Sequence, residues 1–196
     1  MSKSPELGVC YYPEHWPEEM WITDAENMIK NGISWVRIAE FAWSRIEPSS
    51  GVFDWNWLDK IVDILGSNGL KIVMCTPTAT PPKWLVDQMP DMVAIDENGQ
   101  ARKFGSRRHY SFSHIGYQKE SQRITKAVAE RYGQNNFVKA WQTDNEFGCH
   151  ETTYSWCLST LREFRIWLEK KYQNIDDLNK SWGNVFWSME YRSFEE

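Results

Sequence analysis

The sequence lacks the features of a nucleic-acid-binding or membrane protein. Its 196 residues carry 22 Lys and Arg against 27 Asp and Glu, a formal net charge of -5, with no run rich in basic residues. Phosphate-binding proteins concentrate positive charge on one surface, so nucleic acid is not an expected partner. No stretch approaches the roughly 20 apolar residues of a membrane span, and residues 1–6 show no apolar secretory signal. We therefore expect a cytoplasmic protein that does not enter a membrane.

Disulfide and metal-binding patterns are also missing. The four cysteines are widely spaced and form no C-x-x-C pair, so no disulfide framework is predicted. Cys10 and Cys75 end two apolar runs, where we expect small buried thiols. The remaining candidate ligands lack the spacing of a short metal motif, namely His109, His114, His150 and Cys149. The sequence thus predicts neither a metal site nor a cofactor.

A regular alternation of strand-like and helix-like segments runs along the chain. Apolar runs at residues 7–12, 33–38, 70–75 and 138–141 predict strands. Apolar residues at helical spacing predict helices at residues 17–30, 54–67, 117–132 and 159–172, the second with Asp54 as its N-cap. Such an alternation is typical of a parallel α/β sheet.

Two observations favour a barrel over a doubly wound open sheet. An open sheet usually has a glycine-rich phosphate turn after its first strand, and residues 12–17, YPEHWP, contain no glycine. The segments at residues 76–82 and 91–114 have no helix or strand pattern, and loops this long are usually functional. A complete eightfold barrel takes roughly 250 residues. We therefore expect a TIM (β/α)8-type barrel of which residues 1–196 contain only about the first four βα units.

The 12 tryptophans are a large excess for this length. An indole ring either fills core space or offers a flat apolar face on which a sugar ring can stack. We expect most of the tryptophans to pack in the core and a few to line a carbohydrate cleft.

The main candidate chemistry lies where the fourth predicted strand ends, at Asn145 and Glu146. Side chains at the carboxyl ends of barrel strands build active sites. Two carboxyl groups cleave a glycosidic bond, and Glu146 can supply one of them. The Asn145 amide can donate to a sugar hydroxyl. The alternative for Glu146 is a solvated loop acid.

Other charged residues follow the predicted strands. Arg37 and the pair Arg107-Arg108 are long donors suited to hydroxyl recognition, or to surface ion pairs. Glu40 fits an ion pair with Arg37. Spacing alone leaves three acids open as a second carboxylate, namely Glu14, Glu40 and Glu47.

Five runs resemble the β-galactosidases of glycoside hydrolase family 42, in order along nearly the whole chain: residues 11–16 (YYPEHW), 36–44 (VRIAEFAWS), 76–84 (TPTATPPKW), 107–110 (RRHY) and 142–148 (QTDNEFG). The resemblance implies a TIM-barrel catalytic domain that hydrolyses terminal non-reducing β-D-galactose residues with retention. It also implies Glu146 as the general acid/base, Asn145 and Arg107 as galactosyl-binding residues, and Arg37 and Trp187 as further pocket positions.

The resemblance further implies a nucleophilic Glu after the seventh barrel strand, which would lie beyond these residues. Residues 1–196 are then expected to be the N-terminal portion of the catalytic domain, inactive alone, from a family that suggests a homotrimer. Two alternatives stay open. One is a non-catalytic sugar-binding fragment, and the other is a TIM-barrel glycosidase acting on another β-glycan, such as a xylan or β-mannan.

One departure from the family concerns zinc. Some members bind zinc through four cysteines, and at three of those positions this sequence has Ser111, Ser155 and Thr160. Only Cys157 remains. A single thiolate cannot form the tetrahedral site of structural zinc, so we expect no zinc here.

Overall fold

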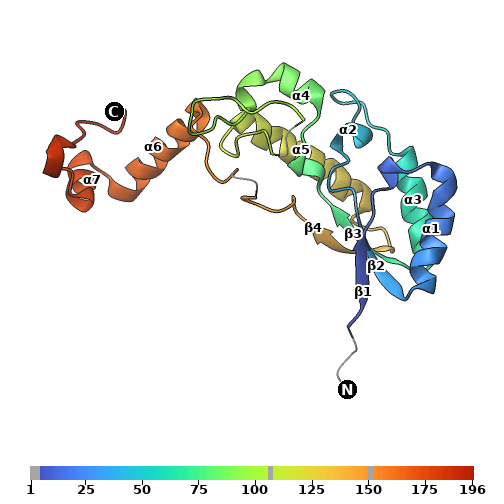
Figure 1. Ribbon diagram of the computed structural model, residues 1–196. Coiled ribbons are helices and arrows are strands. Elements are labelled where there is room, and N and C mark those ends of the chain that lie inside the picture. Colours follow the sequence, from blue (N-terminus) through green and yellow to red (C-terminus); the bar gives the residue numbers. More distant parts are fainter. Residues whose placement is uncertain (1–4, 106–107, 150–151) are drawn as a thin grey trace.

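Four parallel strands form the sheet of this computed structural model, which describes residues 5–105, 108–149 and 152–196 (Figure 1). The strands are β1 (Leu7–Cys10), β2 (Ile33–Ile38), β3 (Lys71–Cys75) and β4 (Val138–Gln142). Each pairs with the next along the chain, in the order β1-β2-β3-β4. The predicted alternation is confirmed. Because all four strands are parallel, their carboxyl ends lie at one edge of the sheet.

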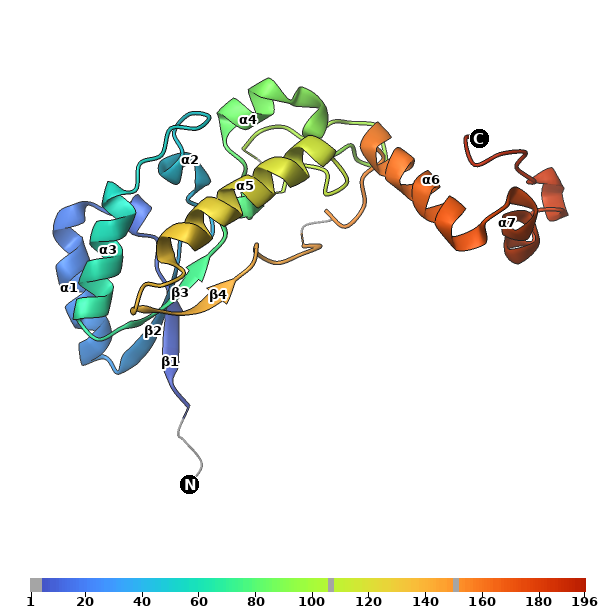
Figure 2. The ribbon, with the colours of Figure 1, turned by 180° about the vertical axis from the view of Figure 1, so that it is seen from behind.

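Three helices cover one face of the sheet (Figures 1 and 2). They are α1 (Glu18–Lys30), α3 (Asn56–Ser67) and α5 (Ile115–Tyr132). The N-cap of α3 is Trp55, so the prediction that Asp54 caps this helix is wrong. The Asp54 carboxylate instead accepts a hydrogen bond from the Asn56 backbone N–H (3.1 Å), which tightens the turn before the helix.

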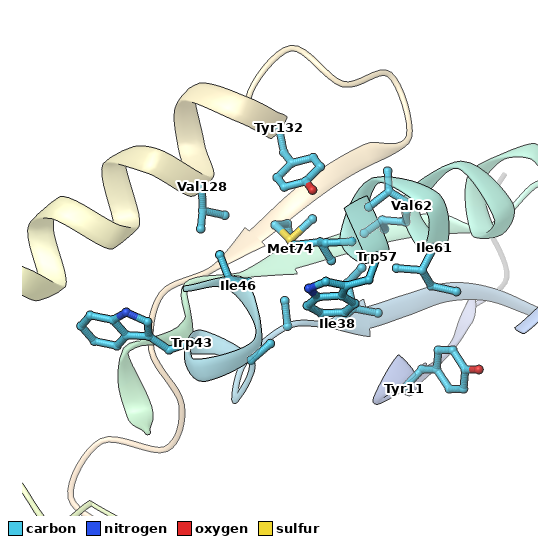
Figure 3. Packing of buried hydrophobic residues seen from close by; sticks show 14 of the residues in the cluster. Tyr11, Ile38, Trp43, Ile46, Trp57, Ile61, Val62, Met74, Val128 and Tyr132 are labelled. Carbon is cyan, nitrogen blue, oxygen red and sulfur yellow. The ribbon is translucent and has the colours of Figure 1, made fainter. Parts of the chain in front are cut away.

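The core lies between this face and the helices (Figure 3). Alternate strand residues point toward the helices, as the period of two in a strand requires. They include Ile38 of β2 and Met74 of β3, both fully buried, which belong to one cluster with Ile61 of α3 and Val128 of α5. Burying a side chain of this kind contributes about 1.5–3 kcal/mol. A Cβ atom at Gly66 would overlap the ring of Phe137, so close packing here requires glycine.

The described parts of the loops at the carboxyl edge contain several short helical elements. These are η1 (Pro13–His15), α2 (Trp43–Ile46), η2 (Pro77–Ala79), α4 (Lys83–Gln88) and η3 (Pro90–Met92). The expectation that residues 76–82 would be neither helix nor strand is wrong for η2. A proline is tolerated at the first position of a helical turn, where its missing N–H would have no partner. Isolated bridges between Val93 and Tyr110 and between Ile95 and Ala101 fold the long loop back on itself.

The last elements extend away from the sheet (Figures 1 and 2). They are α6 (Leu158–Tyr172), α7 (Ile175–Trp182) and η4 (Phe186–Ser188). We call them the C-terminal arm. The fourth predicted helix, at residues 159–172, is present as α6, and it packs against α7. Between α6 and α7, a cavity of about 120 Å³ is lined by Leu161, Phe164, Leu168 and Trp182.

Two expectations about side-chain burial need correction. Cys75 is buried, but Cys10 is exposed because it ends β1, an edge strand of the described sheet. Six of the 12 tryptophans are exposed, so core packing does not account for most of them. Within the described part of the chain, every helix is too short or too polar to cross a bilayer.

Glu47 is a fully buried carboxylate that ties α2 to α5. It accepts hydrogen bonds from Trp43 Nε1 (2.9 Å) and the Gly51 backbone N–H (2.7 Å), and it forms an ion pair with Arg123 of α5 (2.8 Å). Its backbone carbonyl accepts from Trp84 Nε1 (3.0 Å). A carboxylate with this many donors stabilises the loop between β2 and α3 rather than taking part in chemistry.

Replacing Glu47 should therefore destabilise the fold. Glu47→Ala removes the acceptor of the buried Trp43 indole N–H and of the Gly51 backbone N–H, and it leaves Arg123 without this partner, which should lower the free energy of unfolding by about 3 kcal/mol. Urea denaturation followed by tryptophan fluorescence measures the change. Glu130→Ala is the matched control, since its ion pair with Lys126 is exposed and should matter little. Equal losses in the two variants would contradict this role for Glu47.

Candidate functional site

The carboxyl edge of the sheet carries a connected set of polar side chains. Arg37, the second-last residue of β2, donates to Glu40 from Nε (3.2 Å) and Nη2 (2.9 Å). Glu40 is fully buried, and the expected Arg37–Glu40 ion pair is confirmed. The third donor of Arg37, Nη1, reaches Oε1 of Gln142 at the end of β4 (3.0 Å). Arg37 thus connects the ends of two strands that are not neighbours in the sheet.

Gln142 in turn forms hydrogen bonds with the turn that contains Asn145. Its Nε2 donates to the Asp144 backbone carbonyl (2.9 Å) and to Oδ1 of Asn145 (3.3 Å). Because Oδ1 accepts this bond, the hydrogens on Asn145 Nδ2 are the ones that can donate to a ligand. Asn145 is itself buried to 5% exposure. The amide is therefore held in one orientation by a chain that begins at the buried Glu40.

Asp144 fixes the backbone of the same turn. Its Oδ1 accepts from Arg108 Nη2 (2.9 Å) and the Asn145 backbone N–H (2.6 Å), and its Oδ2 accepts from Thr78 Oγ1 (2.8 Å). Its own backbone N–H donates to Thr76 Oγ1 (2.8 Å). Segments following β3 and β4, together with the long loop, therefore meet at one buried carboxylate.

Arg108, which the sequence offered only as one of the pair Arg107-Arg108, is the buried arginine of this cluster. It is 1% exposed, donates from Nη1 to Tyr110 Oη (3.1 Å), and lies over the rings of Phe112 and Phe147. Burial lowers the pKa of Arg108, but the neighbouring Tyr110 and Asp144 outweigh it and raise the pKa, so the guanidinium is charged. Its place in the Arg-Arg-His-Tyr run was the available signal, but the sequence does not say which arginine points inward.

Glu146 lies at the open side of this arrangement. Its side chain is exposed, and its backbone has a positive φ of 47°, while Asp144 has 57°. Left-handed backbone at residues other than glycine costs energy and persists where the surroundings enforce it, often at functional sites. The turn therefore presents the Glu146 carboxylate to solvent beside the buried and oriented Asn145 amide.

Two further acids lie near the same edge. Burial raises the pKa of Glu14, and the charge of Glu40 adds to the increase. Among the described residues, neither Glu14 Oε2 nor Glu40 Oε2 accepts a hydrogen bond. Glu40 is committed to Arg37, so Glu14 is the better candidate of the two for an acid with another role at this edge.

Of the remaining predicted site residues, one is outside the described part of the chain and one lies away from this edge. Arg107 lies outside the described residues. Trp187 belongs to η4, beyond α7 in the C-terminal arm, where it is 78% exposed with a φ of 64°. The structure therefore unites Arg37, Asn145 and Glu146, adds Arg108, and leaves Trp187 apart.

The residues at the positions that the resemblance associates with zinc form a cluster. Thr160 Oγ1 lies 3.2 Å from Ser111 Oγ and 3.3 Å from Cys157 Sγ, and Ser155 Oγ accepts from the Cys157 backbone N–H (3.4 Å). Burial raises the pKa of Cys157, but hydrogen bonds from Ser111, Ser155 and Thr160 outweigh it and lower the pKa to about 7. Hydroxyl groups do not replace thiolates in structural zinc sites, so this donor set does not fit zinc. Across the described residues, no group of three or more His, Cys, Asp or Glu side chains could hold a metal ion.

Comparisons with known proteins agree with this geometry. A family model described as β-galactosidase, that of glycoside hydrolase family 42, matches residues 10–196. A β-galactosidase from Thermus thermophilus is 53% identical over 190 residues, 97% of this chain and 30% of the relative. β-Galactosidase Bga from Halorubrum lacusprofundi is 51% identical over 97% of this chain and 27% of its own length.

A solved structure extends the likeness to the fold. The crystal structure of β-galactosidase from the psychrophilic Marinomonas ef1 superposes with a TM-score of 0.96 at 56% identity, covering 97% of this chain and 29% of the other. The chain thus spans about 30% of the length of the relatives it matches. The four-stranded parallel sheet is part of a TIM-type barrel, as predicted. On sequence and structure together, the chain belongs to glycoside hydrolase family 42.

Proposed function

We propose that the protein acts as a retaining β-galactosidase with Glu146 as its general acid/base. The observation that carries the proposal is the turn after β4, where an exposed carboxylate follows a buried amide held by Gln142. The family description and the names of the relatives supply the substrate class, terminal β-D-galactosides. Those names favour galactosides over xylan or β-mannan.

In the proposed reaction, Glu146 first donates a proton to the glycosidic oxygen as the bond to the anomeric carbon breaks. A second carboxylate attacks that carbon and forms a glycosyl-enzyme intermediate. Glu146, now ionised, removes a proton from water, which attacks the same carbon and releases galactose with retention. We propose that residues 1–196 are the N-terminal portion of the catalytic domain and that later barrel strands supply the nucleophile. Without that nucleophile, these residues alone would not turn over substrate.

The neighbouring residues have supporting roles in this proposal. Asn145 donates from Nδ2 to a sugar hydroxyl, and Arg37 holds Gln142, which orients that amide. Arg107 and Trp187 are kept as substrate-binding positions on the resemblance, and Trp187 would reach the sugar only with the C-terminal arm packed on a complete barrel. A homotrimer remains the expected assembly on the same ground.

A complete enzyme is needed to test Glu146. Residues of this chain can replace the matching 190 residues of the Thermus thermophilus β-galactosidase, which gives a chimera of full length. In it, Glu146→Gln should lower kcat on a nitrophenyl β-galactoside by about 10³-fold, because the general acid and base is lost. Azide should restore turnover and yield β-galactosyl azide, since it attacks the glycosyl-enzyme without needing a base. Glu19→Gln on the exposed face of α1 is the control, and full activity of Glu146→Gln would refute the assignment.

The role of Gln142 predicts a second, distinct kinetic effect. In the same chimera, Gln142→Leu removes the acceptor of Arg37 and the donor to Asn145, so kcat/KM should fall about tenfold. If Gln142 acts by orienting Asn145, the loss in the Gln142→Leu/Asn145→Ala double variant should be smaller than the two single losses combined. Gln134→Leu, an exposed glutamine in the turn before β4, is the control. Additive effects would show that Gln142 does not act through Asn145.

We also propose that the enzyme works without structural zinc, with the hydroxyl cluster around Cys157 linking the long loop to the start of α6. Ser111 belongs to the loop that carries Arg108, and Thr160 belongs to α6. The contact that zinc makes in some relatives is then replaced by hydrogen bonds. These bonds are weaker than metal ligation, which for structural zinc contributes to folding outright.

Restoring the cysteines should create a zinc site. Metal analysis should find no stoichiometric zinc in the unaltered protein, and about one zinc per chain in the Ser111→Cys/Ser155→Cys/Thr160→Cys variant, because four thiolates complete a tetrahedral set. Adding Cys157→Ser to that variant should weaken binding strongly. Stoichiometric zinc in the unaltered protein would overturn the proposal.

A further inference from the structure

A surface cavity of about 650 Å³ lies outside the polar cluster at the strand ends. One wall comes from the tight turn after Ile95 and the other from the segment just before α6. The first wall presents Asp96, Glu97, Asn98 and Arg102, and the second presents Thr153, Tyr154 and Trp156. We call this cavity the loop pocket.

The two walls are held together by one backbone–backbone and one backbone–side-chain hydrogen bond. The Trp156 N–H donates to the Ile95 carbonyl (2.9 Å), and the Ile95 N–H donates to Ser155 Oγ (3.1 Å). The turn itself is closed by Asp96, whose Oδ1 accepts from the backbone N–H groups of Asn98 and Gln100 (both 2.9 Å). The loop pocket is therefore preformed, and a ligand need not order its walls on binding.

The aromatic side chains of the second wall are unusually open. Tyr154 is 73% exposed and Trp156 is 58% exposed, and their ring centroids lie 6.3 Å apart with the planes inclined by 58°. Two apolar rings therefore flank a polar wall that offers a carboxylate, an amide and a guanidinium. Apolar rings opposite a few polar groups match the two kinds of surface on a sugar, whose C–H face stacks while its hydroxyls form hydrogen bonds.

We propose that the loop pocket binds a neutral oligosaccharide. This binding site is separate from the site beside Glu146 at which the terminal sugar is cleaved. Asp96 and Glu97 on the first wall disfavour a phosphorylated or otherwise anionic ligand. Thr153 Oγ1 donates to the Gly148 carbonyl (3.1 Å), so the pocket is joined to the turn that follows Glu146. A chain of several sugars can therefore be retained close to the proposed reaction site. The choice of a galactose-containing probe rests on the proposed function.

The test uses the full-length chimera carrying Glu146→Gln, so that the probe is not consumed. Calorimetric titration with β-1,4-galactotetraose should show that Trp156→Ala weakens binding about tenfold, the size expected for loss of an anchoring aromatic ring. Trp156→Phe should keep most of the affinity. Tyr154→Ala and Asn98→Ala should each weaken binding as well, which guards against a fault specific to one variant. Trp16→Ala removes another exposed indole, which lies outside the loop pocket and is 49% exposed, and is the matched control.

A second measurement separates this site from the proposed reaction. With Glu146 intact, Trp156→Ala should leave hydrolysis of a nitrophenyl β-galactoside unchanged, because that substrate is too short to reach the pocket. Unaltered tetraose affinity in all three pocket variants would overturn the proposal while leaving the proposed function standing. A change of oligomeric state on sedimentation of Trp156→Ala would also overturn it, since the rings would then belong to a subunit contact. A chimera without hydrolytic activity would refute the proposed function but would not alter the binding comparison.

Discussion

The buried carboxylate of Asp144 is the interaction on which the strand-end cluster depends. Placing an ionised carboxylate at 7% exposure is costly unless donors surround it, and here a guanidinium, a hydroxyl and a backbone N–H do so. Removing one partner of such a buried pair typically costs about 3–5 kcal/mol. Three segments distant in sequence are thereby held in register: the turn after β3, the long loop with Arg108, and the turn after β4.

That restraint explains why strained backbone can persist beside it. Asp144 and Glu146 both have positive φ, and each such residue costs of order 1–3 kcal/mol. The bonds to Asp144 fix the turn from one side, and Gln142 fixes Asn145 from the other. Glu146 is an exposed residue of this turn. An acid that must meet a bound sugar benefits from such placement, because its position is set before the substrate arrives.

Much of the fold could be predicted from residue patterns because its elements follow simple periodicities. Strand β2 and helices α1 and α5 lie within a few residues of their predicted positions, since burial of alternate or i, i+3, i+4 positions dominates their stability. The ion pair of Arg37 with Glu40 was also foreseeable from their proximity at one strand end. Patterns failed where burial depends on neighbours in space. Cys10 ends an apolar run like that of Cys75, yet only Cys75 has strands on both sides.

The sequence predicted the types of residue in the site better than the hydrogen bonds that connect them. An amide and an acid after a strand identify Asn145 and Glu146. Nothing local reveals that Gln142, which donates to Asn145, also accepts from Arg37 at 105 positions' distance in the sequence. The same limit applies to Arg108, whose inward direction follows from the long loop folding back on itself. The Gln142 side-chain amide can accept from Arg37 through Oε1 and donate to Asn145 through Nε2 in only one orientation. In that orientation Asn145 Oδ1 is used as an acceptor, and Asn145 Nδ2 is the group that can donate to a ligand. The chemistry proposed for this edge therefore depends on a hydrogen-bond direction that is set at β2, two strands away from the acid it serves.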